Sequence, residues 1–269
     1  MRDPKTILIT GASSGIGEAL AVAYATHDVF LALSGRDAAR LGEIRQRCRN
    51  KGAMIDARVI DVTDAAAMAD WIAKIEAERP IDLVVANAGV SAGTGGGREH
   101  AAQARDVLAI NIDGVMNTVL PAIEAMLARD PTRPDGKPTT KRGQIAIMSS
   151  LVSFRGLPGA PSYCASKAAV RIYGEAMRGE LHHRGIEVNV ICPGYVHSRI
   201  TARNKFPMPM LMDADRAARK IKRALRRNKG RIAFPLTMYW LARLIAGLPV
   251  ALTDPLLRML PRKDAAAKD

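Results

Sequence analysis

Tyr163 and Lys167 have the side-chain types and the spacing of a proton-transfer pair. They are four residues apart, so on a helix their side chains lie on one face, one turn apart. A free phenol titrates near pH ~10, and a neighbouring ammonium group favours the phenolate and lowers the phenol pKa. Ser150 stands thirteen residues before Tyr163, at the end of a strand-like run, where its hydroxyl could meet the phenol. The three residues suit general acid–base chemistry, although the Tyr–Lys pair alone would also fit the solvent-exposed surface of a helix without a catalytic role.

Strand-like apolar runs alternate with helical runs along most of the chain. This alternation predicts an α/β fold: a Rossmann-type, doubly wound, seven-stranded parallel sheet with helices on both faces. The expected strands are Lys5–Thr10, Val29–Ser34, Ala53–Ile60, Ile81–Ala86, Gln144–Ser149, Glu187–Cys192 and Arg231–Phe234. The expected helices are Glu18–His27, Asp37–Asn50, Asp64–Glu78, Glu99–Ala128, Ser162–His183 and Asp213–Asn228. Residues 1–235 are expected to form one domain and 236–269 a C-terminal helical extension; the polar stretch Arg129–Gly143 is expected to be a surface insertion.

Composition limits the classes of protein that this chain can be. Of 269 residues, 48% are hydrophobic and 25% charged, as in ordinary globular proteins. The three cysteines are unpatterned, the five histidines have no metal-ligand spacing, and no signal peptide or uncharged spanning run is visible, so we expect a cytoplasmic protein without a metal site. A net charge of +14 suits nucleic acid, a membrane surface or acidic substrates. Few aromatic residues lie among the basic ones, which argues against nucleic acid.

A glycine-rich turn between the first strand and the first helix has the features of a phosphate site. Gly11, Gly15 and Gly17 would let the backbone approach a pyrophosphate at a helix N-terminus, although a tight turn without a ligand would also use them. The end of the second strand distinguishes the dinucleotides, because an acidic residue there binds ribose hydroxyls and a basic residue accepts a 2′-phosphate. Gly35 is not acidic and Arg36 follows it, so the sequence favours NADP(H).

Five motifs follow one another at characteristic separations. They are Thr10-Gly11-x-x-x-Gly15-x-Gly17, Asp61-Val62, Asn87-Ala88-Gly89, Ser150 with Tyr163-x-x-x-Lys167, and Pro193-Gly194. With these motifs the chain closely resembles the short-chain dehydrogenase/reductase superfamily over residues 5–234. The resemblance implies an enzyme that transfers a hydride between NADP(H) and a carbonyl or alcohol substrate. It also implies a homodimer or homotetramer.

The resemblance further implies catalytic roles for four residues. Tyr163 would protonate the carbonyl oxygen during reduction or act as the base in oxidation. Lys167 would lower the pKa of Tyr163 and hold the nicotinamide ribose, and Ser150 would hydrogen-bond the substrate oxygen. Asn111 would bend the long helix and hold a water that relays protons to Lys167. A non-catalytic NADP-binding or membrane-peripheral interaction protein with the same fold is the alternative.

Further residues are implied to hold the cofactor. They are Gly11, Ser13, Ser14, Gly15, Ile16 and Gly17 in the phosphate turn, Arg36, Asp61 and Val62 at the adenosine, Asn87, Ala88 and Gly89 beside its ribose, Tyr163 and Lys167 at the nicotinamide ribose, and Pro193, Gly194, Val196 and Ser198 at the nicotinamide. Three positions depart from the family pattern. Ala86 replaces a frequent asparagine, Ser198 a usual threonine, and Ser14 a basic residue that some NADP-dependent members carry.

Two features near the C-terminus have more than one interpretation. From Arg216 to Arg231 there are nine basic residues. They fit a solvated helix face as well as they fit a functional patch, which would bind a membrane surface, an acidic carrier protein or a coenzyme A compound, with nucleic acid a distant third. The apolar stretch 235–260 could form two short helices packed on the sheet edge or on a partner, or could lie in a bilayer interface. The resemblance implies that the segment from about Tyr195 to Leu211 covers the substrate. Residues 206–212 are apolar, which favours a hydrophobic ketone or a 3-oxoacyl compound.

Overall fold

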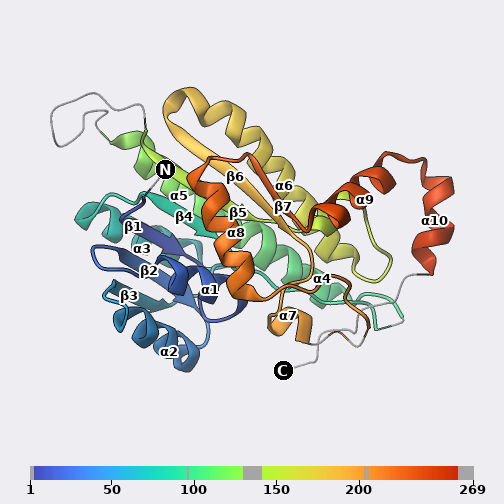
Figure 1. Ribbon diagram of the computed structural model, residues 1–269, viewed down its shortest axis with the longest axis horizontal. Coiled ribbons are helices and arrows are strands. Elements are labelled where there is room, and N and C mark those ends of the chain that lie inside the picture. Colours follow the sequence, from blue (N-terminus) through green and yellow to red (C-terminus); the bar gives the residue numbers. More distant parts are fainter. Residues whose placement is uncertain (1–2, 96, 130–140, 203, 205, 260–269) are drawn as a thin grey trace.

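A seven-stranded sheet, parallel throughout, forms the centre of the protein (Figure 1). The structure is a computed structural model that describes residues 3–95, 97–129, 141–202, 204 and 206–259. The strand order is β3-β2-β1-β4-β5-β6-β7. The strands are β1 (Thr6–Ile9), β2 (Phe30–Gly35), β3 (Met54–Val59), β4 (Leu83–Ala86), β5 (Gly143–Met148), β6 (Ile186–Pro193) and β7 (Arg231–Phe234). The predicted doubly wound sheet is confirmed, and the winding changes direction between β1 and β4, where such folds bind ligands.

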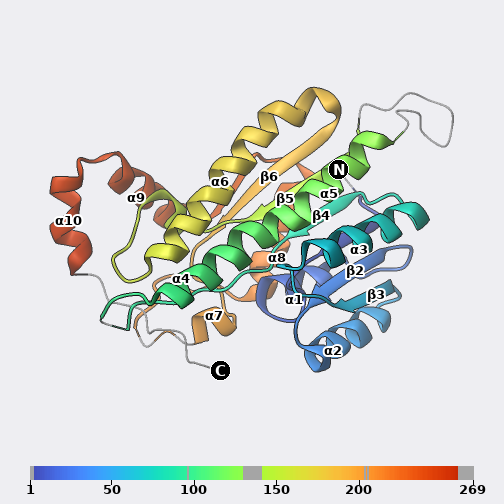
Figure 2. The same cartoon turned by 180° about the vertical axis from the view of Figure 1, so that it is seen from behind.

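Helices cover both faces of this sheet. On one face lie α1 (Gly15–Tyr24), α2 (Ala38–Arg49) and α8 (Ala214–Arg226) (Figure 1). On the other face lie α3 (Ala65–Glu78), α4 (Ala101–Leu108), η1 (Ala109–Asp113), α5 (Gly114–Ala128) and α6 (Pro161–Leu181) (Figure 2). The remaining elements are η2 (Leu151–Phe154), η3 (His182–Arg184), α7 (Arg199–Ala202), α9 (Leu236–Gly247) and α10 (Val250–Arg258). Of the predicted insertion Arg129–Gly143, residues 130–140 lie outside the described part of the chain.

The core lies on both sides of the sheet because successive strand side chains point to opposite faces. In β1, Ile7 and Ile9 pack among residues of α1 and α8, and Leu8 packs among residues of α3 and α5. Strands buried on both faces therefore read as continuous apolar runs, which is why they were visible in the sequence. Asp37 and Asp64 begin α2 and α3, where their carboxylates accept hydrogen bonds from the backbone N–H groups of Arg40 and Ala67.

The single long helix expected over Glu99–Ala128 is interrupted at its middle. The chain is α-helical in α4, changes to the wider π-helical turn η1, and continues as α5. Such turns are frequent at functional sites, and this one contains Asn111. Among the described residues, only the stretch 101–128 is long and apolar enough to cross a membrane by length and composition. It packs against α3 and α6 within the fold.

The C-terminal stretch forms two helices that project beyond β7 from one end of the molecule (Figure 1). α9 contacts β7 and η2. Tyr239 packs edge-on against Phe154 with ring centroids 5.5 Å apart. The expected helical extension is thus confirmed over residues 236–258, while residues 260–269 lie outside the described part of the chain. The extension contacts η2, which directly follows Ser150.

Candidate active site

The motif residues gather at the carboxyl edge of the sheet because all seven strands are parallel and each motif follows a strand. The phosphate turn follows β1, Arg36 follows β2, Asp61 follows β3, Asn87 follows β4, Ser150 follows β5 and Gly194 follows β6. Residues that are far apart in sequence are thereby brought to one edge of one sheet. This is the edge at which open α/β sheets bind their ligands.

Ser150, Tyr163 and Lys167 form a compact cluster at that edge. The Ser150 hydroxyl is hydrogen-bonded to the Tyr163 phenol and lies 3.4 Å from the Pro193 carbonyl oxygen, to which it can donate. Lys167 Nζ lies 6.0 Å from the centroid of the Tyr163 ring. The Lys167 side chain is buried, and its ammonium group donates to the Met148 carbonyl at 3.0 Å. The helical spacing therefore brings phenol and ammonium together as the sequence predicted.

The ionisation of the cluster differs from the expectation in one respect. Burial raises the pKa of Tyr163 to about 12, and only the hydrogen bond from Ser150 opposes this rise appreciably. The Lys167 ammonium lies at the ring rather than on the phenol oxygen and is engaged by a carbonyl, so by itself it does not lower the phenol pKa. Burial lowers the pKa of Lys167 to about 8. In the protein alone the prediction of a lowered phenol pKa is thus wrong, because burial raises this pKa by more than the hydrogen bond from Ser150 lowers it.

Replacing Ser150 with alanine should raise the pKa of Tyr163 further, because the hydrogen bond that stabilises the phenolate is lost. Alcohol oxidation requires the phenolate, so its rate should rise with pH. In Ser150→Ala this rise should occur at higher pH. Carbonyl reduction requires the neutral phenol and should be flat through neutral pH in both proteins. The measurement is kcat/KM against pH in both directions. An unchanged oxidation profile in Ser150→Ala would show that Ser150 does not control this proton.

Asn111 is fully buried and holds the π-helical turn against two neighbouring segments. Its Oδ1 accepts from the Val90 N–H at 2.8 Å, and its Nδ2 donates to the Val90 carbonyl and to Ser166 Oγ. A Cβ atom at Gly89 would lie 3.0 Å from Asn111 Oδ1 and 3.1 Å from Lys167 Nζ. Both polar atoms therefore border the space beside Gly89, and Asn111 adjoins the cluster of Ser150, Tyr163 and Lys167.

The phosphate turn leaves a cradle that only glycines can form. Gly11 and Gly15 have positive φ values of 64° and 60°. A Cβ atom on Gly17 would lie 2.3 Å from the Gly11 carbonyl oxygen and 2.5 Å from Asn87 Nδ2. The Ser14 side chain makes no capping hydrogen bond at the start of α1. The first-turn N–H groups of α1 have no intrahelical acceptors, so the turn fits the pyrophosphate of a dinucleotide.

Asn87 joins this turn to β4. Its Nδ2 donates to the Thr10 and Gly11 carbonyl oxygens, and Thr10 Oγ1 accepts from the Asn87 and Ala88 N–H groups. The Asn-Ala-Gly motif thus fixes the shape of the glycine turn from the neighbouring strand. The substitution at Ala86 does not disturb this, because Ala86 is buried in β4.

Arg36 and Asp61 stand together at the adenosine end of the edge. Arg36 Nη1 lies 3.8 Å from Asp61 Oδ2, and the two side chains are 61% and 42% exposed. Burial would raise the pKa of Asp61, but the Thr63 N–H and hydroxyl, with Arg36 nearby, hold that pKa below its usual value. Because the Arg36 side chain is 61% exposed, its guanidinium is accessible at the end of β2. Beside Asp61, the Val62 carbonyl accepts from Asn117 Nδ2 at 2.9 Å.

Residues after β6 close the opposite end of the edge. The Gly194 N–H donates to the Phe234 carbonyl, and Val196 pairs with Met212 as an isolated bridge. Ser198 and the phosphate turn are close, since a Cβ atom on Gly15 would lie 2.9 Å from Ser198 Cβ. Ser13 is also near this edge, with its Oγ 3.0 Å from the Cβ position of Gly35. The structure thus brings all the candidate cofactor residues to one edge.

One positioning residue was missed by sequence reasoning. Glu99 precedes α4, and its carboxylate accepts from both the N–H and the hydroxyl of Ser162 at 3.1 and 2.5 Å. It therefore caps the first turn of α6, the helix that carries Tyr163. Because 63 residues separate the two partners, no local pattern could have found this contact.

Comparisons with known proteins place the chain in a family. A family model described as short chain dehydrogenase matches residues 5–207. An uncharacterized oxidoreductase of Myxococcus xanthus is 35% identical over 257 residues, covering 95% of this chain and 97% of its own. A short chain dehydrogenase/reductase from Burkholderia phymatum, in complex with NAD, superimposes with a TM-score of 0.79 at 23% identity over 99% of both chains. A short-chain dehydrogenase from Sphingobium yanoikuyae, in complex with NADPH, superimposes with a TM-score of 0.75 at 24% identity, covering 97% of this chain and 98% of its own.

The fold and the site thus define an α/β oxidoreductase in which the carboxyl edge of the sheet fits a dinucleotide. The chain belongs to the short-chain dehydrogenase/reductase family. It is accordingly an NAD(P)-dependent oxidoreductase, and the resemblance inferred from its motifs is confirmed.

Proposed function

We propose that this protein transfers a hydride between NADP(H) and the carbonyl or alcohol carbon of a hydrophobic substrate. Residues 1–235 would form the dinucleotide-binding and catalytic domain. The observation that carries the proposal is the cluster of Ser150, Tyr163 and Lys167 at the carboxyl edge of the sheet, beside the glycine turn. A homodimer or homotetramer, which light scattering would detect, and a cytoplasmic location belong to the same proposal.

The catalytic roles follow from the contacts of the cluster. When bound, the nicotinamide cofactor supplies or accepts the hydride. In reduction, Tyr163 Oη donates its proton to the carbonyl oxygen, and Ser150 Oγ donates a hydrogen bond to the same oxygen. Tyr163 then regains a proton through the space bordered by Lys167 Nζ and Asn111 Oδ1. A pKa of about 8 for Lys167 suits a group that passes protons near neutral pH.

A preference for NADP(H) is proposed from Arg36. Related structures hold NADPH or NAD, so the choice depends on this chain's own residues. Gly35 provides no carboxylate for the ribose hydroxyls, and the exposed Arg36 guanidinium can pair with a 2′-phosphate in a forked geometry.

Replacing Arg36 with leucine should raise KM for NADPH by about 10–100-fold, because a charge-assisted hydrogen bond to the 2′-phosphate contributes roughly 1.5–3 kcal/mol. KM for NADH should change little, because NADH lacks that phosphate. The measurement is KM for each dinucleotide with one carbonyl substrate. Equal changes in the two KM values would refute the assignment of Arg36 to the 2′-phosphate.

A hydrophobic substrate is proposed from the segment that follows β6. Phe206 packs against Tyr195 with ring centroids 6.3 Å apart, and the segment 206–212 contains no charged residue. We propose a hydrophobic ketone or a 3-oxoacyl compound. The test is NADPH consumption with ketones, 3-oxoacyl thioesters, steroids and sugars. Turnover of sugars alone would contradict the proposal.

The alternative, a non-catalytic protein that retains the fold, has less support. Ser150, Tyr163, Lys167 and Asn111 are all present and make mutual or adjoining contacts. A protein that had lost catalysis would have no need to keep the phenol, the ammonium and the buried amide together. Binding of NADPH without turnover of any compound in the carbonyl panel would favour the alternative.

A further inference from the structure

The two C-terminal helices expose apolar stripes. In α9, in α10 and at the residue that caps α10, eight large apolar side chains are each more than half exposed. Six of them recur every three or four residues: Leu236, Trp240 and Leu244 in α9, Leu252 and Leu256 in α10, and Met259 at its C-cap; Leu241 and Val250 are the other two. Helical spacing places each set along one side of its helix. Exposed apolar surface of this extent marks an interaction site more often than a free surface.

Both helices are fixed to the fold, so these stripes have a defined orientation. Tyr239 packs on Phe154 and accepts a hydrogen bond from Arg231 at 3.1 Å. In α10, Asp254 pairs with Arg155 at 2.9 Å, and Arg155 also donates to Thr253 Oγ1. The anchoring residues Phe154 and Arg155 belong to η2 and its end, close to Ser150.

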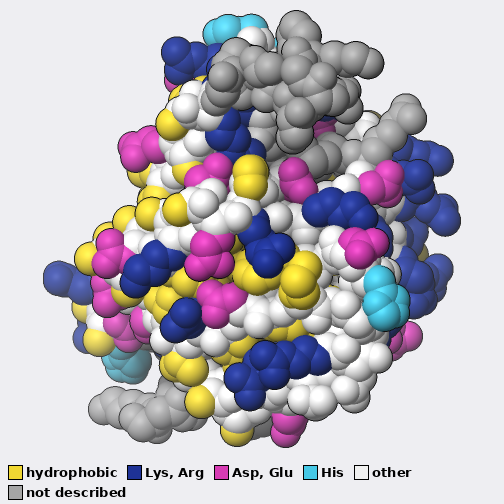
Figure 3. Space-filling view, turned by 90° about the vertical axis from the view of Figure 1, so that its left-hand side faces the viewer, with side chains coloured by type: hydrophobic (Ala, Val, Ile, Leu, Met, Phe, Trp, Pro, Cys, Tyr) yellow, Lys and Arg dark blue, Asp and Glu magenta, His cyan; other side chains and the backbone are white. Residues whose placement is uncertain are grey.

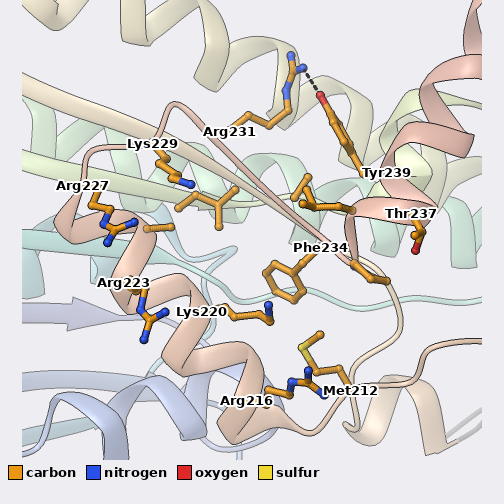
Figure 4. A pocket seen from close by; sticks show the side chains of 15 residues that line it. Met212, Arg216, Lys220, Arg223, Arg227, Lys229, Arg231, Phe234, Thr237 and Tyr239 are labelled. Carbon is orange, nitrogen blue, oxygen red and sulfur yellow. Dashed lines mark hydrogen bonds between the residues drawn. The ribbon is translucent and has the colours of Figure 1, made fainter.

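A basic cleft of about 550 Å³ lies beside these helices, between α8 and β7 (Figure 4). Its basic side chains are Arg216, Lys220, Arg223, Arg227 and Lys229, and Arg231, which is bound by Glu175. Within the described part of the chain, no carboxylate lies within 4 Å of the first five. Ile232 and Phe234 form an apolar part of the wall. The cleft therefore presents unneutralised positive charge next to apolar surface.

The basic cleft adjoins the apolar stripe of α9. Leu236, Thr237 and Tyr239 of α9 line the cleft, and Leu236 is also the first residue of the α9 stripe. Figure 4 shows the basic side chains of α8 along one wall and α9 residues along the other. At the opposite end of the molecule, acidic and basic side chains are interspersed instead (Figure 3).

We propose that this surface, the basic cleft with the stripes of α9 and α10, docks on an anionic lipid bilayer. The stripes would enter the interface between headgroups and acyl chains, and the cleft would accept lipid phosphates. Trp240 suits this depth because an indole is favoured at membrane interfaces. A second copy of the chain fits less well, because a symmetric contact would bring two basic clefts together.

The test is co-sedimentation of the full chain with vesicles of phosphatidylcholine, with or without phosphatidylglycerol. We expect binding to the anionic vesicles, weakened by salt. Arg223→Glu with Arg227→Glu should reduce binding about tenfold or more, and Leu244→Asp should also reduce it. Trp240 fluorescence should shift to the blue on binding. All three positions are exposed, and an unchanged melting temperature would verify the fold of each variant.

Matched controls use the far end of the sheet. Arg45→Glu with Arg49→Glu in α2 changes the net charge equally, and Met54→Asp in β3 adds one carboxylate at an exposed apolar position; both should bind like the parent. No sedimentation with anionic vesicles at low salt, or equal losses in controls and test variants, would overturn the proposal. If only charge reversal reduces sedimentation and Trp240 emission stays unchanged, the cleft binds lipid headgroups without entry of the stripes into the bilayer, and the proposed docking by the stripes is refuted.

Discussion

Replacing Tyr163 with phenylalanine should reduce kcat for NADPH-dependent carbonyl reduction by about 10²–10⁴-fold, the usual contribution of a general acid. The change removes one hydroxyl and keeps the ring, so the shape of the site is retained. No other hydroxyl of the cluster can replace the proton donor easily, because Ser150 Oγ is an ordinary alcohol. The dissociation constant for NADPH, measured by fluorescence, should change little, which separates a loss of chemistry from a loss of binding.

Tyr173 provides a matched control on the same helix. It is partly buried and packs against the core formed with α3 and α5, away from the carboxyl edge. Tyr173→Phe removes the same hydroxyl from α6 and should leave kcat within a factor of about two, as expected where no reacting group is touched. Activity of Tyr163→Phe comparable to that of Tyr173→Phe would exclude Tyr163 as the acid.

Replacing Gly17 with alanine should damage both binding and stability. The added methyl group would lie 2.3 Å from the Gly11 carbonyl oxygen and 2.5 Å from Asn87 Nδ2. These atoms belong to the glycine turn and to the side chain that holds it by hydrogen bonds. Relief of the overlap must move that turn, which we expect to cost about 1–3 kcal/mol of folding free energy. The affinity for NADPH should fall at least about tenfold, because the shape of the phosphate cradle is lost. Denaturant titration and NADPH titration measure the two effects.

Gly42 in α2 offers the corresponding control. A Cβ atom there would meet nothing within 4 Å. Gly42→Ala should stabilise the protein by about 0.5–1 kcal/mol, because alanine loses less backbone entropy in a helix, and NADPH affinity should be unchanged. Retention of parental stability and NADPH affinity by Gly17→Ala would show that the turn does not need its glycine.

Much of the fold was predictable because its physical causes are local. Strands buried on both faces are continuous apolar runs. The last strand, Arg231–Phe234 at the sheet edge, is buried at alternate residues, and it was predicted with these bounds. The helix starts at Asp37 and Asp64 were visible as capping residues. Since all strands are parallel, the motifs at their carboxyl ends had to meet at one edge, and this allowed the site to be assembled from the sequence.

Features that depend on distant contacts could not be predicted. The resemblance implied a bend of the long helix at Asn111, but the form of that bend, a π-helical turn, follows from hydrogen bonds to Val90 and Ser166. The apolar pattern alone resembles that of an uninterrupted helix. The pKa of Tyr163 depends on burial and on the position of the Lys167 ammonium, neither of which spacing reveals. The stretch 235–260 was recognisably apolar, but which of its side chains face solvent depends on how Tyr239 and Asp254 anchor the helices.

Hydride transfer with proton delivery from Tyr163 is most directly tested with NADPH that carries deuterium at the transferable position. The protein and its Tyr163→Phe variant would each be saturated with this cofactor and given a carbonyl compound that the parent reduces. We expect mass spectrometry to find one deuterium on the former carbonyl carbon of the alcohol that the parent forms. In the same time the variant should form almost no deuterated alcohol, despite equal NADPH binding. Equal deuterium incorporation by both proteins, or an alcohol without deuterium from the parent, would contradict the proposed function.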